Sequence, residues 1–79
     1  MTNKLHPQIK LVEAREKMGL TQEELGKRTL ISRSLIANIE RGYAKPSLEK
    51  ANRIAVALNS SVNEIFIFFE SNVQNSNVS

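Results

Sequence analysis

The sequence predicts an all-α fold, a compact bundle of five short helices. Apolar residues recur at intervals of three and four along most of the chain, and serine, threonine, glycine and proline stand where helix ends are expected. No stretch alternates apolar and polar residues between turn dipeptides, as a strand would. We expect one domain over residues 1–70, followed by a mobile polar tail at 71–79 that has little apolar content.

The first two helices have recognisable starts and ends. The first helix is predicted to start near Pro7, a residue that suits a first helical turn, and to stop at Gly19. The inner stripe of this helix is predicted to be Leu11, Ala14, Arg15 and Met18. The second helix opens with Thr21-x-x-Glu24, a capping box, and ends near Arg28.

The third helix is predicted between Ser32, a suitable N-cap, and Gly42, a suitable left-handed C-cap. Ile36 and Ile39 form its inner stripe, with Leu35 at the margin. We therefore expect a helix of about two turns that is held by its neighbours rather than by its own propensity.

The fourth helix opens at Pro46-Ser47 and ends at Asn59, and a second capping box, Ser61-x-x-Glu64, opens the fifth. The inward residues of the fourth helix are predicted to be Leu48, Ala51, Ile54, Ala55 and Leu58. Those of the fifth helix are Val62, Ile65, Phe66 and Phe69.

The second and third helices form a helix-turn-helix arrangement, because about four residues, 29–32, join them and force a steep crossing. Gly26 is small enough to let the two backbones approach. The side chains spaced to point into the angle are Leu25, Ile31, Ile36 and Ile39. Burial of Ile36 and Ile39 puts four other residues of the third helix on the outer face: Arg33, Ser34, Ala37 and Asn38.

This outer face suits the major groove of DNA, which admits an α-helix. Arg33 can bond guanine, Asn38 can bond adenine, and the methyl group of Ala37 can touch a thymine methyl. Up to Pro46 the chain has nine Lys or Arg against five Glu, whereas the remainder has a net charge of −1. A basic N-terminal half favours a polyanion as partner, although ordinary solvated residues on a surface helix would give the same composition.

The sequence resembles the phage repressor and Cro type of helix-turn-helix protein, the Xre family, over residues 9–66. The segments "GLTQEEL", "ISRSLIANIERG", "PSLEKANRIAVAL" and "VNEIF" match in order and spacing. The resemblance implies a lambda-repressor-like domain of five helices. It also implies a transcriptional regulator, a repressor or autoregulator of the phage, mobile-element or restriction-modification type, that binds a palindromic operator of double-stranded DNA as a homodimer.

The resemblance also assigns roles in DNA binding and in the fold to individual residues. Base readout falls on Arg33, Ser34, Ala37 and Asn38, and contacts to DNA phosphate fall on Thr21, Gln22, Arg41, Tyr43 and Lys45. A buried ion pair is expected between Arg15 and Glu40. Two positions depart from the family pattern: Leu30 stands where a turn glycine is common, and Gly26 replaces an alanine. A left-handed backbone would be costly at Leu30.

Ile67 and Phe68 are the expected dimer contacts. If the fifth helix turns Val62 and its stripe towards the bundle, these two apolar side chains point outward, and a two-fold dimer would cover them. The alternative is that they fold back over the first helix as additional core.

Composition argues against other classes of function. The chain has no cysteine, no aspartate and one histidine, so we expect no enzyme, no metal and no cofactor. No apolar run approaches the length of a membrane span, and a cytoplasmic location is expected. The remaining alternative is an antitoxin or protein-interaction module that also binds its own promoter.

Overall fold

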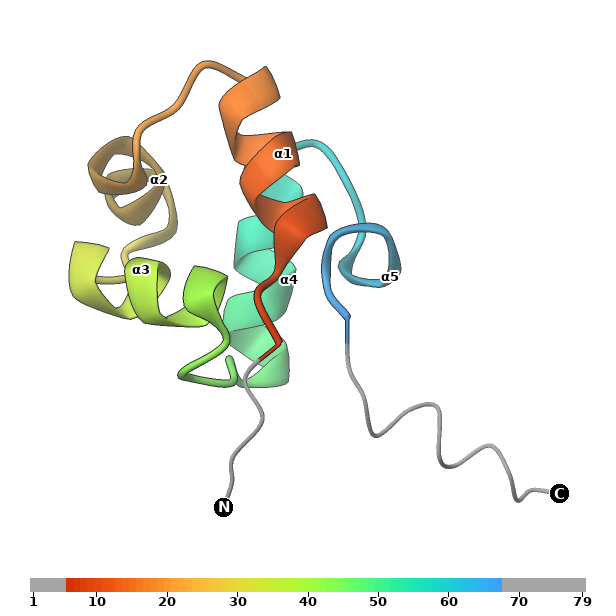
Figure 1. Ribbon diagram of the computed structural model, residues 1–79. Coiled ribbons are helices and arrows are strands. Elements are labelled where there is room, and N and C mark those ends of the chain that lie inside the picture. The colour runs from red at the N-terminus through yellow and green to blue at the C-terminus, as the bar shows by residue number, and fades with distance from the viewer. Residues whose placement is uncertain (1–5, 68–79) are drawn as a thin grey trace, which may run out of the picture.

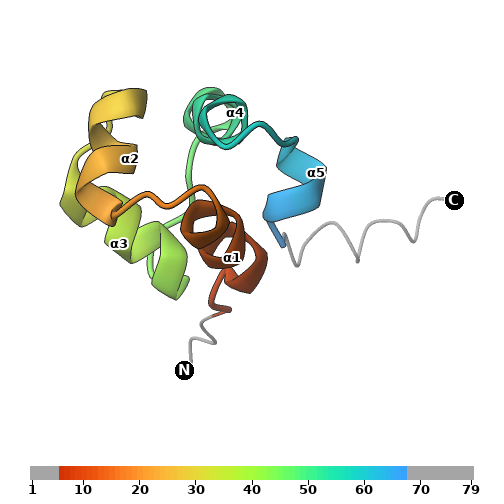
Figure 2. The same cartoon turned by 90° about the horizontal axis from the view of Figure 1, so that it is seen from above.

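The computed structural model describes residues 6–67, which form five helices joined by short loops. Figure 1 shows α1 and α4 at the centre, with α2 and α3 on one side and α5 on the other, and Figure 2 shows the same division from above. The helices are α1 (Ile9–Lys17), α2 (Gln22–Thr29), α3 (Arg33–Arg41), α4 (Leu48–Ala57) and α5 (Val62–Ile65). The predicted all-α class is confirmed.

A single apolar core holds these short helices together. Within the described range, its buried apolar members are Leu11, Leu20, Leu25, Ile31, Ile36, Ile39, Ala51, Ile54, Ala55, Leu58, Ile65 and Phe66. Full burial of one leucine or isoleucine side chain stabilises a fold by about 1.5–3 kcal/mol. The stability of each helix therefore comes from the helices packed against it. Among residues 6–67, no helix has the length and apolarity that crossing a bilayer requires.

Three predicted helix starts and one predicted end are confirmed. Thr21 and Glu24 make both bonds of the capping box, at 3.0 and 2.9 Å. The hydroxyl groups of Ser32 and Ser47 each accept a backbone N–H three residues later. Gly42 ends α3 in the left-handed conformation, with φ +84°. These signals need only neighbouring residues, so they are readable from sequence.

Three details of α1 and α4 were predicted wrongly. The first helix begins at Ile9, two residues after Pro7, near which its start was expected, because Gln8 is not helical (φ −89°, ψ 77°) and gives its N–H to another segment. Met18 is exposed because α1 ends at Lys17, one residue before it. Leu48 is 72% exposed, since it is the first residue of α4 and lies beyond the packed part of the helix.

The fifth helix is shorter than predicted. It ends at Ile65, and Phe66 is extended (φ −113°, ψ 139°), although its side chain remains in the core. The capping box at Ser61 is incomplete because the Ser61 side chain makes no cap bond; instead the hydroxyl of Ser60 donates to Glu64 at 2.9 Å. The expectations for Phe68, Phe69 and the polar tail lie outside the described residues.

The turn between α2 and α3 keeps a left-handed residue at Leu30. This turn consists of residues 30–32, and Leu30 has φ 62° and ψ 34° with a side chain 84% exposed. Its backbone strain is therefore offset by almost no side-chain burial. The close approach that the sequence predicted at Gly26 is also present, since a Cβ there would stand 2.6 Å from the carbonyl oxygen of Ile31.

Replacing Leu30 with glycine is expected to stabilise the protein by about 0.5–1 kcal/mol. A left-handed conformation costs an L residue about 1–2 kcal/mol, which glycine avoids. The greater freedom of glycine in the unfolded chain offsets about 0.5–1 kcal/mol of this gain in stability. Urea denaturation measures the change. Asn59→Gly is the matched control, because Asn59 is also left-handed (φ 56°) but asparagine tolerates that region, so its gain should be smaller. A Leu30→Gly variant less stable than wild type would mean that the leucine side chain contributes packing.

Candidate nucleic-acid interface

The outer face of α3 carries the residues that the sequence assigned to base readout. Ile36 and Ile39 are fully buried against the rest of the bundle. Arg33 and Ser34 are exposed, whereas Ala37 and Asn38 are half-buried. Residues four apart share a helix face, so positions 33, 34, 37 and 38 form one patch. Ser32 caps the helix directly before Arg33, and this cap puts Arg33 in the first turn.

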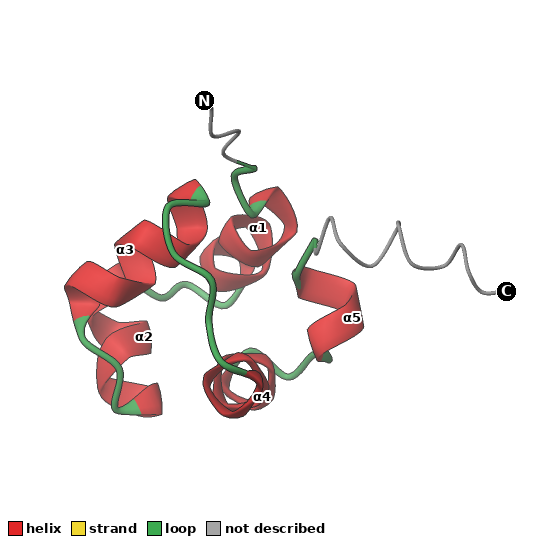
Figure 3. Cartoon of the chain, turned by 90° about the horizontal axis from the view of Figure 1, so that it is seen from below, coloured by secondary structure: helices red, strands yellow, loops and turns green. Residues whose placement is uncertain are grey.

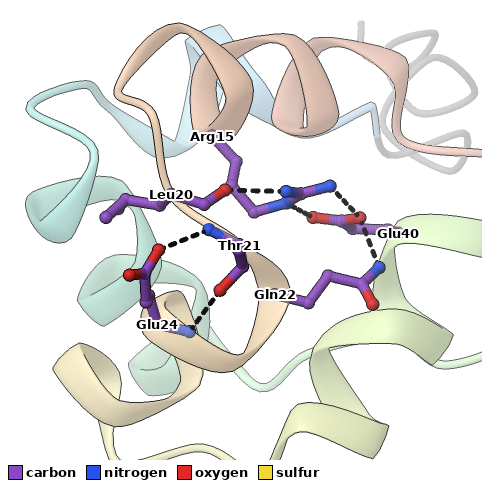
Figure 4. A network of polar contacts seen from close by, with 6 residues as sticks. All are labelled: Arg15, Leu20, Thr21, Gln22, Glu24 and Glu40. Atoms are coloured by element: carbon purple, nitrogen blue, oxygen red, sulfur yellow. Dashed lines mark hydrogen bonds and ion pairs between the residues drawn. The ribbon is translucent and has the colours of Figure 1, made fainter.

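A buried carboxylate at the end of α3 ties three helices together (Figure 4). Arg15 of α1 donates to Glu40 with Nε at 2.6 Å and Nη2 at 3.1 Å, a two-pronged ion pair. The amide of Gln22 in α2 donates to the same carboxylate at 2.9 Å, and Arg15 Nη1 donates to the carbonyl of Leu20 at 2.8 Å. The hydrogen bond with Glu40 raises the pKa of Arg15 above its ordinary value.

The N-terminus of α2 presents free backbone donors. Glu24 gives its N–H to the Thr21 hydroxyl, while the N–H groups of Gln22 and Glu23 find no acceptor among residues 6–67. Figure 4 shows Thr21 and Gln22 side by side at this end of the helix. The N–H of Thr21 donates into the Glu24 carboxylate and lowers the pKa of Glu24. Thr21 and Gln22 are thus held by intrachain bonds next to two donors that suit an anion.

The loop from α3 to α4, drawn in Figure 3, carries the second group of candidate phosphate contacts. The N–H groups of Tyr43 and Ala44 fold back onto the carbonyl of Asn38, at 2.8 and 3.1 Å. The guanidinium of Arg41 lies 4.9 Å from the centre of the Tyr43 ring, a cation–π contact. Arg41, Tyr43 and Lys45 are all exposed. The loop therefore offers two cations beside the C-terminus of α3.

The expected dimer residue Ile67 lies away from these groups. Figure 2 shows α5, which precedes it, separated from α2 and α3 by α1 and α4. The side chain of Ile67 is 43% exposed, so the alternative that placed it in additional core is wrong for this residue. Phe68 lies outside the described residues.

Two contacts of this arrangement have no signal in the sequence. Gln8 bonds the backbone of Ile67, which is 59 residues away, through both atoms of its side-chain amide. Arg53 of α4 donates to the carbonyl of Thr29 at 2.8 Å and so satisfies an acceptor at the C-terminus of α2. Neither pair stands at helical spacing, and only the folded chain brings the partners together.

Comparison with known proteins gives consistent similarities. The family model described as Helix-turn-helix matches residues 11–65. An HTH-type transcriptional regulator of Archaeoglobus fulgidus is 43% identical over 61 residues, covering 77% of this chain and 86% of that protein. The restriction-modification controller protein C.AhdI from Aeromonas hydrophila is 35% identical, with a TM-score of 0.68 over 72% of this chain and 86% of that one. The clp gene regulator ClgR from Corynebacterium glutamicum is 28% identical, with a TM-score of 0.69 over 73% of this chain and 62% of that one.

Proposed function

Because the chain belongs to the helix-turn-helix family of DNA-binding transcriptional regulators, we propose that it binds a palindromic operator as a homodimer and acts as a repressor or autoregulator. The observation that carries the proposal is the outer face of α3, where Arg33 and Ser34 are exposed in front of two fully buried isoleucines. In this role the protein binds DNA in the cytoplasm and catalyses no reaction.

In this proposal α3 reads bases. Arg33 donates in bidentate fashion to guanine, Asn38 pairs with adenine, Ser34 bonds a base edge, and the methyl group of Ala37 contacts thymine. The backbone carbonyl of Asn38 accepts the N–H groups of Gly42, Tyr43 and Ala44 and so holds the start of the following loop against the end of α3.

Phosphates on either side of the groove are bound by two sets of groups. At the start of α2, Thr21 and Gln22 lie next to two backbone donors, and a helix N-terminus favours an anion. At the end of α3, Arg41, Tyr43 and Lys45 are exposed together. Stacking of Arg41 on the Tyr43 ring supports the assignment, because it reduces the freedom that the guanidinium would lose on binding phosphate.

Substitution of two arginines separates base readout from phosphate anchoring. After selection of an operator from a random DNA pool, Arg33→Ala is expected to lose about 1–3 kcal/mol of discrimination at one base-pair position. Arg41→Ala is expected to weaken binding to all sequences alike and to reduce the salt slope by about one. Fluorescence anisotropy with single-base operator variants measures both. Lys10→Ala removes the same charge from α1 as a control. An unchanged ranking of the variants with Arg33→Ala would remove the base-readout role.

The homodimer is proposed to form through Ile67 and Phe68. Exposure of the Ile67 side chain supports this surface, since a two-fold dimer covers the same apolar patch on both chains. Phe68→Glu is expected to make the protein monomeric at micromolar concentration and to weaken full-operator binding about tenfold or more, because the two half-sites are no longer bound together. Analytical ultracentrifugation and operator titration measure these changes. A Phe68→Glu protein that stays dimeric and binds the operator as wild type does would place the interface elsewhere.

A further inference from the structure

Gln8, the residue before α1, connects two segments that are far apart in the sequence. Its backbone N–H donates to the carbonyl oxygen of Glu40, in the last turn of α3, at 2.8 Å. Its side-chain Nε2 donates to the carbonyl oxygen of Ile67 at 3.1 Å, and its Oε1 accepts the N–H of Ile67 at 2.7 Å. Gln8 is only 7% exposed. One buried residue thus joins the end of α3 to the segment that follows α5.

The pairing with Ile67 depends on a primary amide. Such a group carries a donor and an acceptor side by side, so it can satisfy both backbone groups of one residue, as a neighbouring β-strand does. Glutamate has the same shape but no donor when ionised, and methionine has a similar length but makes neither bond. The Gln8 side chain makes this pairing instead of capping α1.

This pairing also sets which side chain of the C-terminal segment faces the core. In extended backbone, successive side chains point to opposite sides. Phe66 is extended and 5% exposed, whereas Ile67 is 43% exposed. Because Gln8 holds both backbone groups of Ile67, the segment cannot turn over without breaking two hydrogen bonds.

We propose that Gln8 is a positioning residue for dimeric DNA binding, a role that rests on the homodimer proposed above. Gln8 presents the side chain of Ile67 to a second copy of the chain. Through Glu40 it also keeps that surface at a constant position relative to α3. A two-fold dimer reads adjacent half-sites only if its recognition helices lie one DNA turn apart, about 34 Å. A contact surface that is already ordered loses less freedom on association.

The test uses Gln8→Glu in the full chain, because this change keeps the shape of the side chain while it removes the donor to Ile67 and adds a charge at a buried position. Sedimentation equilibrium gives the dimer dissociation constant, and fluorescence anisotropy gives the affinities for a single half-site and for the full operator. The dimer and full-operator dissociation constants are expected to rise about tenfold or more, while half-site affinity stays unchanged. Asn63→Asp, at an exposed position in α5, is the control for the change in net charge and should change none of the three.

Gln8→Met is the second variant, because it removes both hydrogen bonds without adding charge and should give the same pattern. Wild-type dimerisation in both variants would overturn the role of Gln8 and leave the proposed homodimer standing. A fall in half-site affinity in parallel with dimerisation would also overturn it, since this is the result of a general loss of stability. A monomeric wild-type protein would overturn the homodimer itself, and with it this role.

Discussion

Replacing Glu40 with alanine is expected to lower the free energy of unfolding by about 3–5 kcal/mol, and Arg15→Ala is expected to do the same. The side chains of Arg15 and Glu40 are 11% and 5% exposed, so water solvates the charge that is left behind only poorly. Without Glu40, the guanidinium keeps the hydrogen bond to the carbonyl of Leu20 and the weaker attraction of Glu16, and the amide of Gln22 loses its acceptor. The cost comes from the stranded charge rather than from the net contribution of the pair.

Urea denaturation of both single variants and of the double variant measures this effect. The double variant should lose less than the sum of the single losses, because no charge is stranded when both partners are removed. Lys27→Ala is the control, since Lys27 and Glu23 form an exposed pair at 4.0 Å that should contribute no more than about 0.5 kcal/mol. A Glu40→Ala denaturation curve that coincides with wild type would contradict the assignment of Glu40 as a structural charge.

Gly42→Ala is expected to destabilise the protein by about 2–5 kcal/mol, from two sources. Gly42 is left-handed, which costs an L residue about 1–2 kcal/mol. A Cβ at this position would also stand 2.5 Å from the carbonyl oxygen of His6, and overpacking of this kind costs about 1–3 kcal/mol. The crowded atoms belong to the backbone of the segment that leads to Gln8, so relieving the clash would disturb the bonds of Gln8 as well.

Gly19→Ala is the matched control for this change. Gly19 is also left-handed, with φ +73°, but a Cβ there would meet nothing within 4 Å. Its loss of stability should therefore be limited to about 1–2 kcal/mol, the cost of the backbone conformation. The difference between the two variants in urea denaturation isolates the close approach at Gly42. Equal losses would show that the segment before α1 can move aside without cost.

Much of the candidate interface was predictable because its geometry is local. The outer face of α3 follows from helical periodicity once Ile36 and Ile39 are assigned to the core, and both are fully buried. The Arg15–Glu40 pair was expected only from the resemblance to a family, since 25 residues separate the partners. The exposed position of Ile67 was expected, but the basis for it, a fifth helix continuing past Phe66, was wrong.

By itself, the sequence determined the number of helices, their order and most of their ends. A capping residue such as Thr21 or a left-handed glycine such as Gly42 acts on atoms within about four residues, so its effect can be read along the chain. Only the tertiary structure decided where the C-terminal segment leaves the helical conformation. The amide of Gln8 offers the backbone of Ile67 two hydrogen bonds from 59 residues away. Together with burial of the extended Phe66, this pairing takes the place of a further helical turn that local spacing would have favoured.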